Sequence, residues 1–120
     1  PTAPVDLRAE AGYKWGYALA KRAQAAKEEG TRDQLDKAAA VLWSVVDAFL
    51  IDPTMAAKLG AKGRYWLARS LLELGQLQED SGQLDEVRRA YQLIVENKLY
   101  GAVQAQAKLA RFQPNREEKP

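Results

Sequence analysis

Apolar residues recur along this chain at alternating steps of three and four positions, the spacing of one face of an α-helix. The clearest stripe predicts one helix and consists of Leu35, Ala38, Leu42, Val45 and Phe49. A second stripe predicts another helix, ending near Asn97, and consists of Leu84, Val87, Tyr91 and Ile94. No segment alternates apolar and polar residues over a useful length, so we expect no strands. The pattern predicts an all-α protein.

Glycine and proline divide the first half of this pattern. The first helix is expected from about Leu7 to Glu29, because that stretch is rich in alanine and free of proline. Gly30 is a good helix stop, and Thr31 or Asp33 is a plausible N-cap for the next helix. Asp52-Pro53 ends that second helix, because the residue before proline is pushed out of the helical region.

The second half divides in the same way. We expect Thr54 to cap a third helix that runs from about Met55 past Leu77 and is closed by Gly75 or Gly82. A short last helix is expected over residues 100–112. Residues 1–6 are expected to be a flexible lead-in, and residues 113–120 a flexible polar tail that has no apolar face to pack. The prediction is therefore about five helices.

A three-residue motif, called here the repeated phrase, consists of leucine, alanine and a basic residue and occurs three times in the chain. Its copies are Leu19-Ala20-Lys21, Leu67-Ala68-Arg69 and Leu109-Ala110-Arg111. A helix pair cannot cover its own apolar face, so repeated pairs are expected to stack. We predict two units, about residues 7–53 and 54–99, and a capping helix at about 100–112. The alanine of each phrase would let a neighbouring helix approach closely.

The second unit resembles a tetratricopeptide repeat. Its first helix has the family's order of aromatic, leucine, small, bulky and glycine residues, at Tyr65, Leu67, Ala68, Leu71 and Gly75. Its second helix has Val87, Tyr91 and Ile94 at the family's alanine, aromatic and alanine positions, and the first unit matches at Tyr17, Leu19, Ala20, Ala39 and Trp43. The copies lie further apart than in the family, so the chain is better described as tetratricopeptide-like. The resemblance implies a short α-solenoid that docks a partner segment in its concave face.

Two basic and aromatic trios are the candidate binding residues. Superposing the first phrase on the second aligns Lys14, Tyr17 and Lys21 with Lys62, Tyr65 and Arg69. Steps of three and four place each trio on one face of its helix. The resemblance implies that this face lines the concave groove, where cations and phenols would suit an acidic segment or a terminal carboxylate. The alternative is that the cations are solvated and the tyrosines pack between units.

The three tryptophans allow two interpretations each. Trp43 lies beside an apolar stripe and is expected in the core. Trp15 and Trp66 adjoin the candidate residues, and burial in the core is the interpretation we favour over contact with a ligand.

The composition argues against catalysis. The chain contains no histidine and no cysteine, which excludes histidine-dependent catalysis, thiol nucleophiles and cysteine-ligated metals. The acidic pairs Glu28-Glu29, Glu79-Asp80 and Glu117-Glu118 are interpreted as solvated charges rather than paired catalytic carboxylates. We therefore expect no enzyme activity, no metal and no cofactor.

The charge balance narrows the class of partner. The formal net charge is +2, with 18 basic and 16 acidic residues, which argues against nucleic acid or another polyanion. A polyanion surface would have to use Lys14, Lys21, Arg22, Lys62, Arg64, Arg69, Arg88, Arg89 and Arg111. No apolar run approaches about 18 residues, so no membrane span is expected. We predict a soluble protein–protein interaction module, with a structural or self-association domain of a larger protein as the alternative. The sequence leaves the compartment open between the cytoplasm and the periplasm or secretion.

Overall fold

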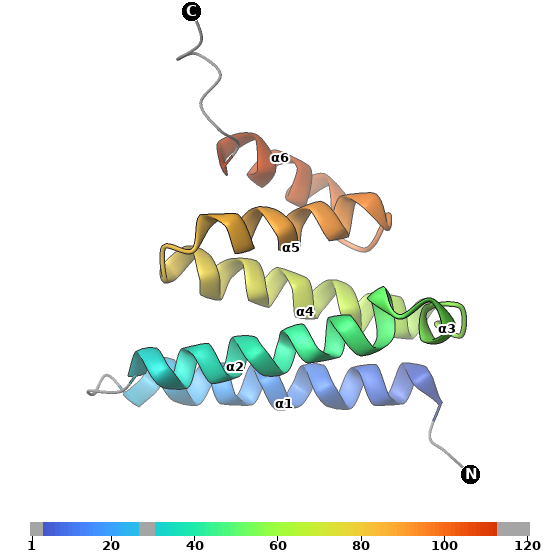
Figure 1. Ribbon diagram of the computed structural model, residues 1–120, viewed down its shortest axis with the longest axis horizontal. Helices are drawn as coiled ribbons and strands as arrows, with labels where there is room; N and C mark the ends of the chain where they lie inside the picture. Colours follow the sequence, from blue (N-terminus) through green and yellow to red (C-terminus); the bar gives the residue numbers. More distant parts are fainter. Residues whose placement is uncertain (1–3, 27–30, 113–120) are drawn as a thin grey trace, which may run out of the picture.

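The computed structural model describes residues 4–26 and 31–112 of the chain, and every regular element in these ranges is a helix (Figure 1). The helices are α1 (Val5–Ala26), α2 (Thr31–Val46), α3 (Pro53–Ala56), α4 (Ala61–Asp80), α5 (Leu84–Glu96) and α6 (Ala102–Phe112). One π-helical turn, η1 (Asp47–Ile51), extends α2. The all-α prediction is confirmed for the described residues. The stop at Gly30, the pairs Glu28-Glu29 and Glu117-Glu118, and the tail over 113–120 lie outside them.

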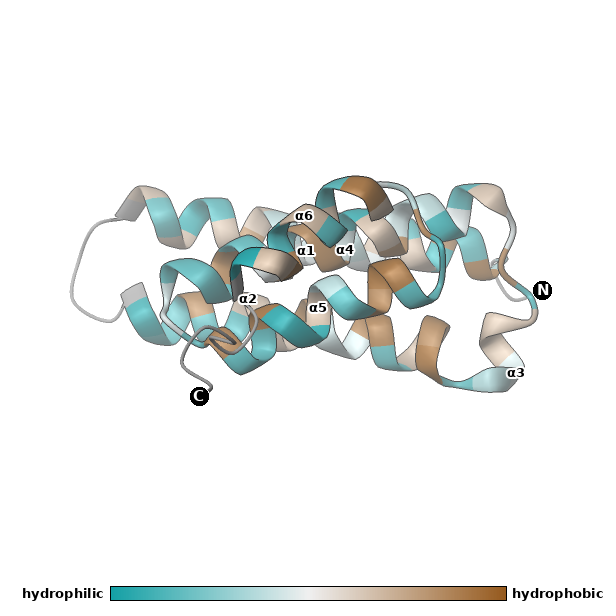
Figure 2. Ribbon diagram, turned by 90° about the horizontal axis from the view of Figure 1, so that it is seen from above, coloured by the Kyte–Doolittle hydropathy of each residue, from teal (hydrophilic) through white to brown (hydrophobic). Residues whose placement is uncertain are grey.

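Each long helix runs antiparallel to the next long helix in the chain, and the helices stack in sequence order from α1 to α6 (Figure 1). Helix α4 packs against both α1 and α2, α5 packs against α4, and α6 packs against α5. Viewed along the stacking direction, α1 and α4 lie on one side, and α2 and α5 lie on the other (Figure 2). The first helices of the two predicted units are therefore neighbours on the same side.

The predicted stripes face the core, with one exception. On the second helix and its π-helical extension, Ala38, Leu42, Val45 and Phe49 are buried and Leu35 is half-buried. On α5 the stripe residues Val87, Tyr91 and Ile94 are buried, together with Ala90. Leu84 is 45% exposed, because it is the first residue of α5 and its side chain leans toward the free end of the helix. The stripe on α5 is thus shorter than predicted.

Small residues bring the helices together as expected at two of the three repeated phrases, whereas Ala110 in the third is exposed. Ala20 on α1 and Ala68 on α4 are completely buried. Gly16 allows α1 to approach α2, since a Cβ at that position would lie 2.5 Å from Cδ2 of Leu42. Gly75 plays the same part between α4 and α5, because a methyl group there would overlap the ring of Tyr91. Gly75 therefore lies inside α4, and Gly82, with φ +76°, follows its end.

The first helix begins earlier than expected. Val5 and Asp6 belong to α1 rather than to a lead-in, because Val5 packs against the core. The Asp6 carboxylate accepts a hydrogen bond of 2.8 Å from the backbone amide of Gly60, which ties the start of α1 to the start of α4. Tertiary contacts of this kind hold the first turn in place.

The predicted third helix is divided into two. Helix α3 is a single turn, and α4 begins only at Ala61 after a break at residues 57–60. The cap of α3 is Asp52 rather than Thr54, because the Asp52 carboxylate accepts hydrogen bonds from the amides of Thr54 (2.9 Å) and Met55 (3.2 Å). The last helix also begins later than expected, at Ala102, because Gly101 adopts φ +86° and forms the turn before it.

Candidate functional site

The six candidate residues all belong to α1 and α4, which pack side by side. The contacts described below join them into one region, called here the α1–α4 surface. It consists of Glu10, Tyr13, Lys14, Tyr17, Lys21, Lys62, Tyr65, Trp66, Arg69, Glu73 and Tyr100. Five of the six residues predicted from the sequence therefore lie in a single network of contacts, and Lys62 lies at its edge.

A chain of five aromatic rings runs across this surface. Tyr17 contacts Tyr13 with ring centroids 5.6 Å apart, and Tyr13 contacts Trp66 on the neighbouring helix at 5.4 Å. Trp66 then contacts Tyr65 at 5.1 Å, and Tyr65 contacts Tyr100 at 5.2 Å. The rings are tilted or edge-on to one another, as aromatic pairs prefer. The chain links α1, α4 and the turn before α6.

Arg69 is held in place by this chain. Its guanidinium donates to the hydroxyl oxygens of Tyr65 (2.8 Å) and Tyr13 (2.9 Å), and it lies over both rings. The hydrogen bond to Tyr65, ahead of the other contacts, raises the pKa of Arg69. Burial raises the pKa of the Tyr13 hydroxyl, with the nearby Arg69 acting in the opposite direction. Arg69 thus connects α4 to α1.

Two lysines on α1 are paired within the chain. Lys14 lies 2.6 Å from a carboxylate oxygen of Glu10 and stands over the Trp66 ring. Lys21 lies 3.8 Å from a carboxylate oxygen of Glu73 and over the Tyr17 ring. Burial raises the pKa of Glu73, while Lys21 and Arg69 act to lower it. These lysines stay largely exposed, but each already has an acidic neighbour.

Lys62 differs from the other cations of the surface. It is exposed on the first turn of α4 and has no ion-pair partner among the residues that the structure describes. It borders a hollow of about 450 Å³ whose other walls are Glu10, Ala61, Tyr65 and Trp66. The walls are therefore mostly apolar, with Lys62 as the cation that is not already engaged.

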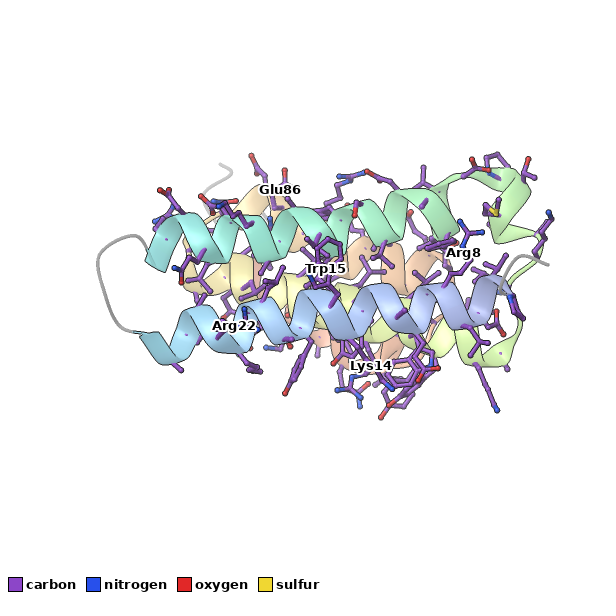
Figure 3. The ribbon with its side chains drawn as sticks, turned by 90° about the horizontal axis from the view of Figure 1, so that it is seen from below. Arg8, Lys14, Trp15, Arg22 and Glu86 are labelled. Carbon is purple, nitrogen blue, oxygen red and sulfur yellow. The ribbon has the colours of Figure 1, made fainter. Side chains whose placement is uncertain are left out.

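The tryptophans divide between three environments. Trp43 packs against the core, as predicted, and the Arg89 guanidinium lies 4.4 Å from its ring centroid. Trp66 is half-buried in the aromatic chain. The core interpretation is wrong for Trp15, which is 61% exposed. It projects from the opposite side of α1 to Lys14 (Figure 3), because the helical step of 100° turns adjacent residues apart.

The cations of the polyanion alternative are spread over α1, α4, α5 and α6, which belong to both layers of the fold. Several are engaged within the chain. Arg64 donates to the backbone carbonyl of Asn97, Arg88 pairs with Asp85, and Arg89 lies 3.9 Å from Asp47.

Sequence reasoning missed several members of the α1–α4 surface. Tyr13 and Glu10 stand four residues before Tyr17 and Lys14, and Glu73 stands four residues after Arg69. A search for neighbours at this helical spacing would have found all three. Tyr100 had no such signal, since it comes from the turn before α6 and reaches Tyr65 only through the packing of the helices.

The described residues contain no group of three or more acidic side chains that could hold a metal ion. Within the same ranges, no helix is both long and apolar enough to cross a membrane. Comparison of the chain with protein-family models, with curated proteins and with solved structures finds no significant match.

Proposed function

We propose that this chain is a non-catalytic protein–protein interaction module, a short tetratricopeptide-like solenoid that docks an acidic partner segment on the α1–α4 surface. The packing of α4 on both helices of the preceding pair supports the solenoid, since stacked helix pairs bury their faces in this way. The shared side of α1 and α4 supports the position of the groove (Figure 2).

The observation that carries the proposal is the aromatic chain bordered by cations. Aromatic side chains dominate the energetics of protein interfaces, and Tyr17, Tyr65, Trp66 and Tyr100 all keep part of their surface exposed. Lysines around such a surface favour an acidic partner and oppose a basic one. The surface therefore offers both contact area and charge selection.

The test is a titration with defined peptides. Two fluorescein-labelled pools of twelve-residue peptides would have the same apolar content, one rich in aspartate and glutamate and the other in lysine and arginine. We expect the acidic pool to raise the fluorescence anisotropy at concentrations at least tenfold lower than the basic pool. Equal binding of the two pools, or no binding of either, would refute the proposal.

The matched variants are Lys62→Glu and Lys37→Glu, which change the net charge equally. Lys62→Glu places an acid in the first turn of α4, where the helix dipole tolerates it, so folding should be preserved. Lys37 is exposed on α2, in the opposite layer. Only Lys62→Glu should weaken the acidic pool, by severalfold. A loss of equal size in Lys37→Glu would place the binding elsewhere.

Self-association within a larger protein is the second candidate, and the outer face of α6 favours it. Val103 is 82% exposed, and Ala107 and Ala110 continue the same exposed stripe along the helix. Sedimentation velocity over a range of concentrations tests it directly. A dimer that Val103→Glu disrupts would favour this candidate, and a monomer at every concentration would exclude it.

A further inference from the structure

The hollow beside Lys62 indicates what the docked segment carries. We infer that the segment contains a large apolar side chain next to a carboxylate, with the apolar side chain in the hollow and the carboxylate on Lys62. The inference rests on the proposed function and specifies its ligand.

The walls of the hollow select an apolar side chain. Its lining includes Ala61 and the rings of Tyr65 and Trp66, and its volume of about 450 Å³ lies within the usual range of ligand pockets, roughly 300–1,000 Å³. A single large side chain therefore fits. Both rings have fixed positions, since Arg69 holds the Tyr65 hydroxyl and Tyr13 packs on Trp66. A hollow with rigid walls binds without the cost of ordering them.

The charges around the hollow select the neighbouring group. Glu10 is already paired with Lys14, and Arg69 already donates hydrogen bonds to two tyrosine hydroxyls. Lys62 is exposed at the rim and has no ion pair among the described residues. Aromatic walls beside a carboxylate can also receive a cation. Lys14, which stands 5.3 Å from the centroid of the Trp66 ring, and Lys62 would repel one, so a carboxylate is favoured.

The experiment uses five peptides that differ at two central positions within the same glycine, serine and aspartate background. Their centres are Glu-Phe, Gln-Phe, Glu-Ser, Gln-Ser and Arg-Phe. We expect the Glu-Phe peptide to bind the wild-type protein best by fluorescence anisotropy. Replacing phenylalanine by serine should weaken binding at least tenfold, and replacing glutamate by glutamine should weaken it about two- to fivefold, the scale of an exposed ion pair. Tighter binding of the Arg-Phe peptide would show that the hollow receives a cation.

Two protein variants assign the contacts. In Lys62→Met, the change from glutamate to glutamine should no longer matter, because the pairing cation is gone. In Ala61→Trp, which fills the hollow from an exposed position, the preference for phenylalanine over serine should disappear. If glutamate and phenylalanine keep their full effects in these two variants, the inference is wrong.

The experiment distinguishes a failure of the inferred ligand from a failure of the proposed binding function. If the mixed acidic pool binds the wild-type protein but the Glu-Phe peptide has no advantage, the inference fails and the proposed function stands. If neither binds, the proposed function fails together with the inference. Circular dichroism of each variant confirms that it is folded before it is titrated.

Discussion

Replacing Arg69 by alanine tests whether this cation stabilises the fold. The change removes the hydrogen bonds that its guanidinium donates to Tyr65 and Tyr13. Hydrogen bonds to charged groups contribute about 1.5–3 kcal/mol each. Arg69 is only half-buried, so the low end of that range applies. Tyr13, which is 4% exposed, would lose the partner of its hydroxyl, so we expect a total loss of about 3 kcal/mol.

Urea denaturation followed by circular dichroism measures this loss. With a slope of about 2 kcal/mol per molar urea, the midpoint should fall by roughly 1.5 M. The control is Lys58→Ala, which removes an exposed cation from the turn after α3 and should change stability by less than about 0.5 kcal/mol. A midpoint for Arg69→Ala within 0.2 M of the wild type would refute the structural role.

A double-mutant cycle with Tyr13→Phe separates the hydrogen bond from other effects of the arginine. In the wild-type background, removing the hydroxyl should cost about 1 kcal/mol. In the Arg69→Ala background it should cost nothing or stabilise, because it removes a buried hydroxyl that has lost its partner. The expected coupling is about 1 kcal/mol or more. Additive effects would show that the two side chains act independently.

Three further predictions follow from the packing, one cap and one buried phenol. Ala68→Trp should destabilise the fold by about 1–3 kcal/mol, because Ala68 is completely buried and a larger side chain would overpack the helices. An unchanged urea midpoint would contradict this. Asp52→Ala should cost about 1 kcal/mol through loss of the cap of α3, measured in the same assay, and Asp52→Asn should retain most of the stability. Burial raises the pKa of Tyr91 from 10.0 to about 12, so the unfolded chain ionises first and stability should fall between pH 10 and 12, by up to about 2–3 kcal/mol. Tyr91→Phe should flatten that part of the pH dependence, and an identical slope in this variant would exclude Tyr91 as its source.

The role of Arg69 affects how the candidate site is tested. From the sequence, Lys21 and Arg69 are equivalent members of the repeated phrase. In the structure, Lys21 is about half exposed at its side chain and lies near Glu73, whereas Arg69 bridges two helices. A substitution at Arg69 would therefore weaken binding and folding together. Lys62 is the better probe of the surface, because its side chain has no such contact within the described residues.

The sequence by itself determined the all-helical class and most of the buried faces of the helices. The stripe from Ala38 to Phe49 and the buried Ala20 and Ala68 follow from periodicity and side-chain size, which are local properties. The position of the two trios on α1 and α4 could be predicted in the same way. These features can be predicted without knowing which helix packs against which.

Only the tertiary structure decided what each candidate residue does. A lysine or arginine on a helix face looks the same in the sequence whether it is solvated, paired or fixed between helices. The difference between Lys62 and Arg69 arises because Tyr13 on α1 reaches Arg69, while no described ion-pair partner reaches Lys62. The early start of α1 has the same kind of cause, since the Gly60 amide that binds Asp6 lies far away in the sequence. Periodicity determines which side of a helix is apolar, and packing between helices determines which polar groups remain available.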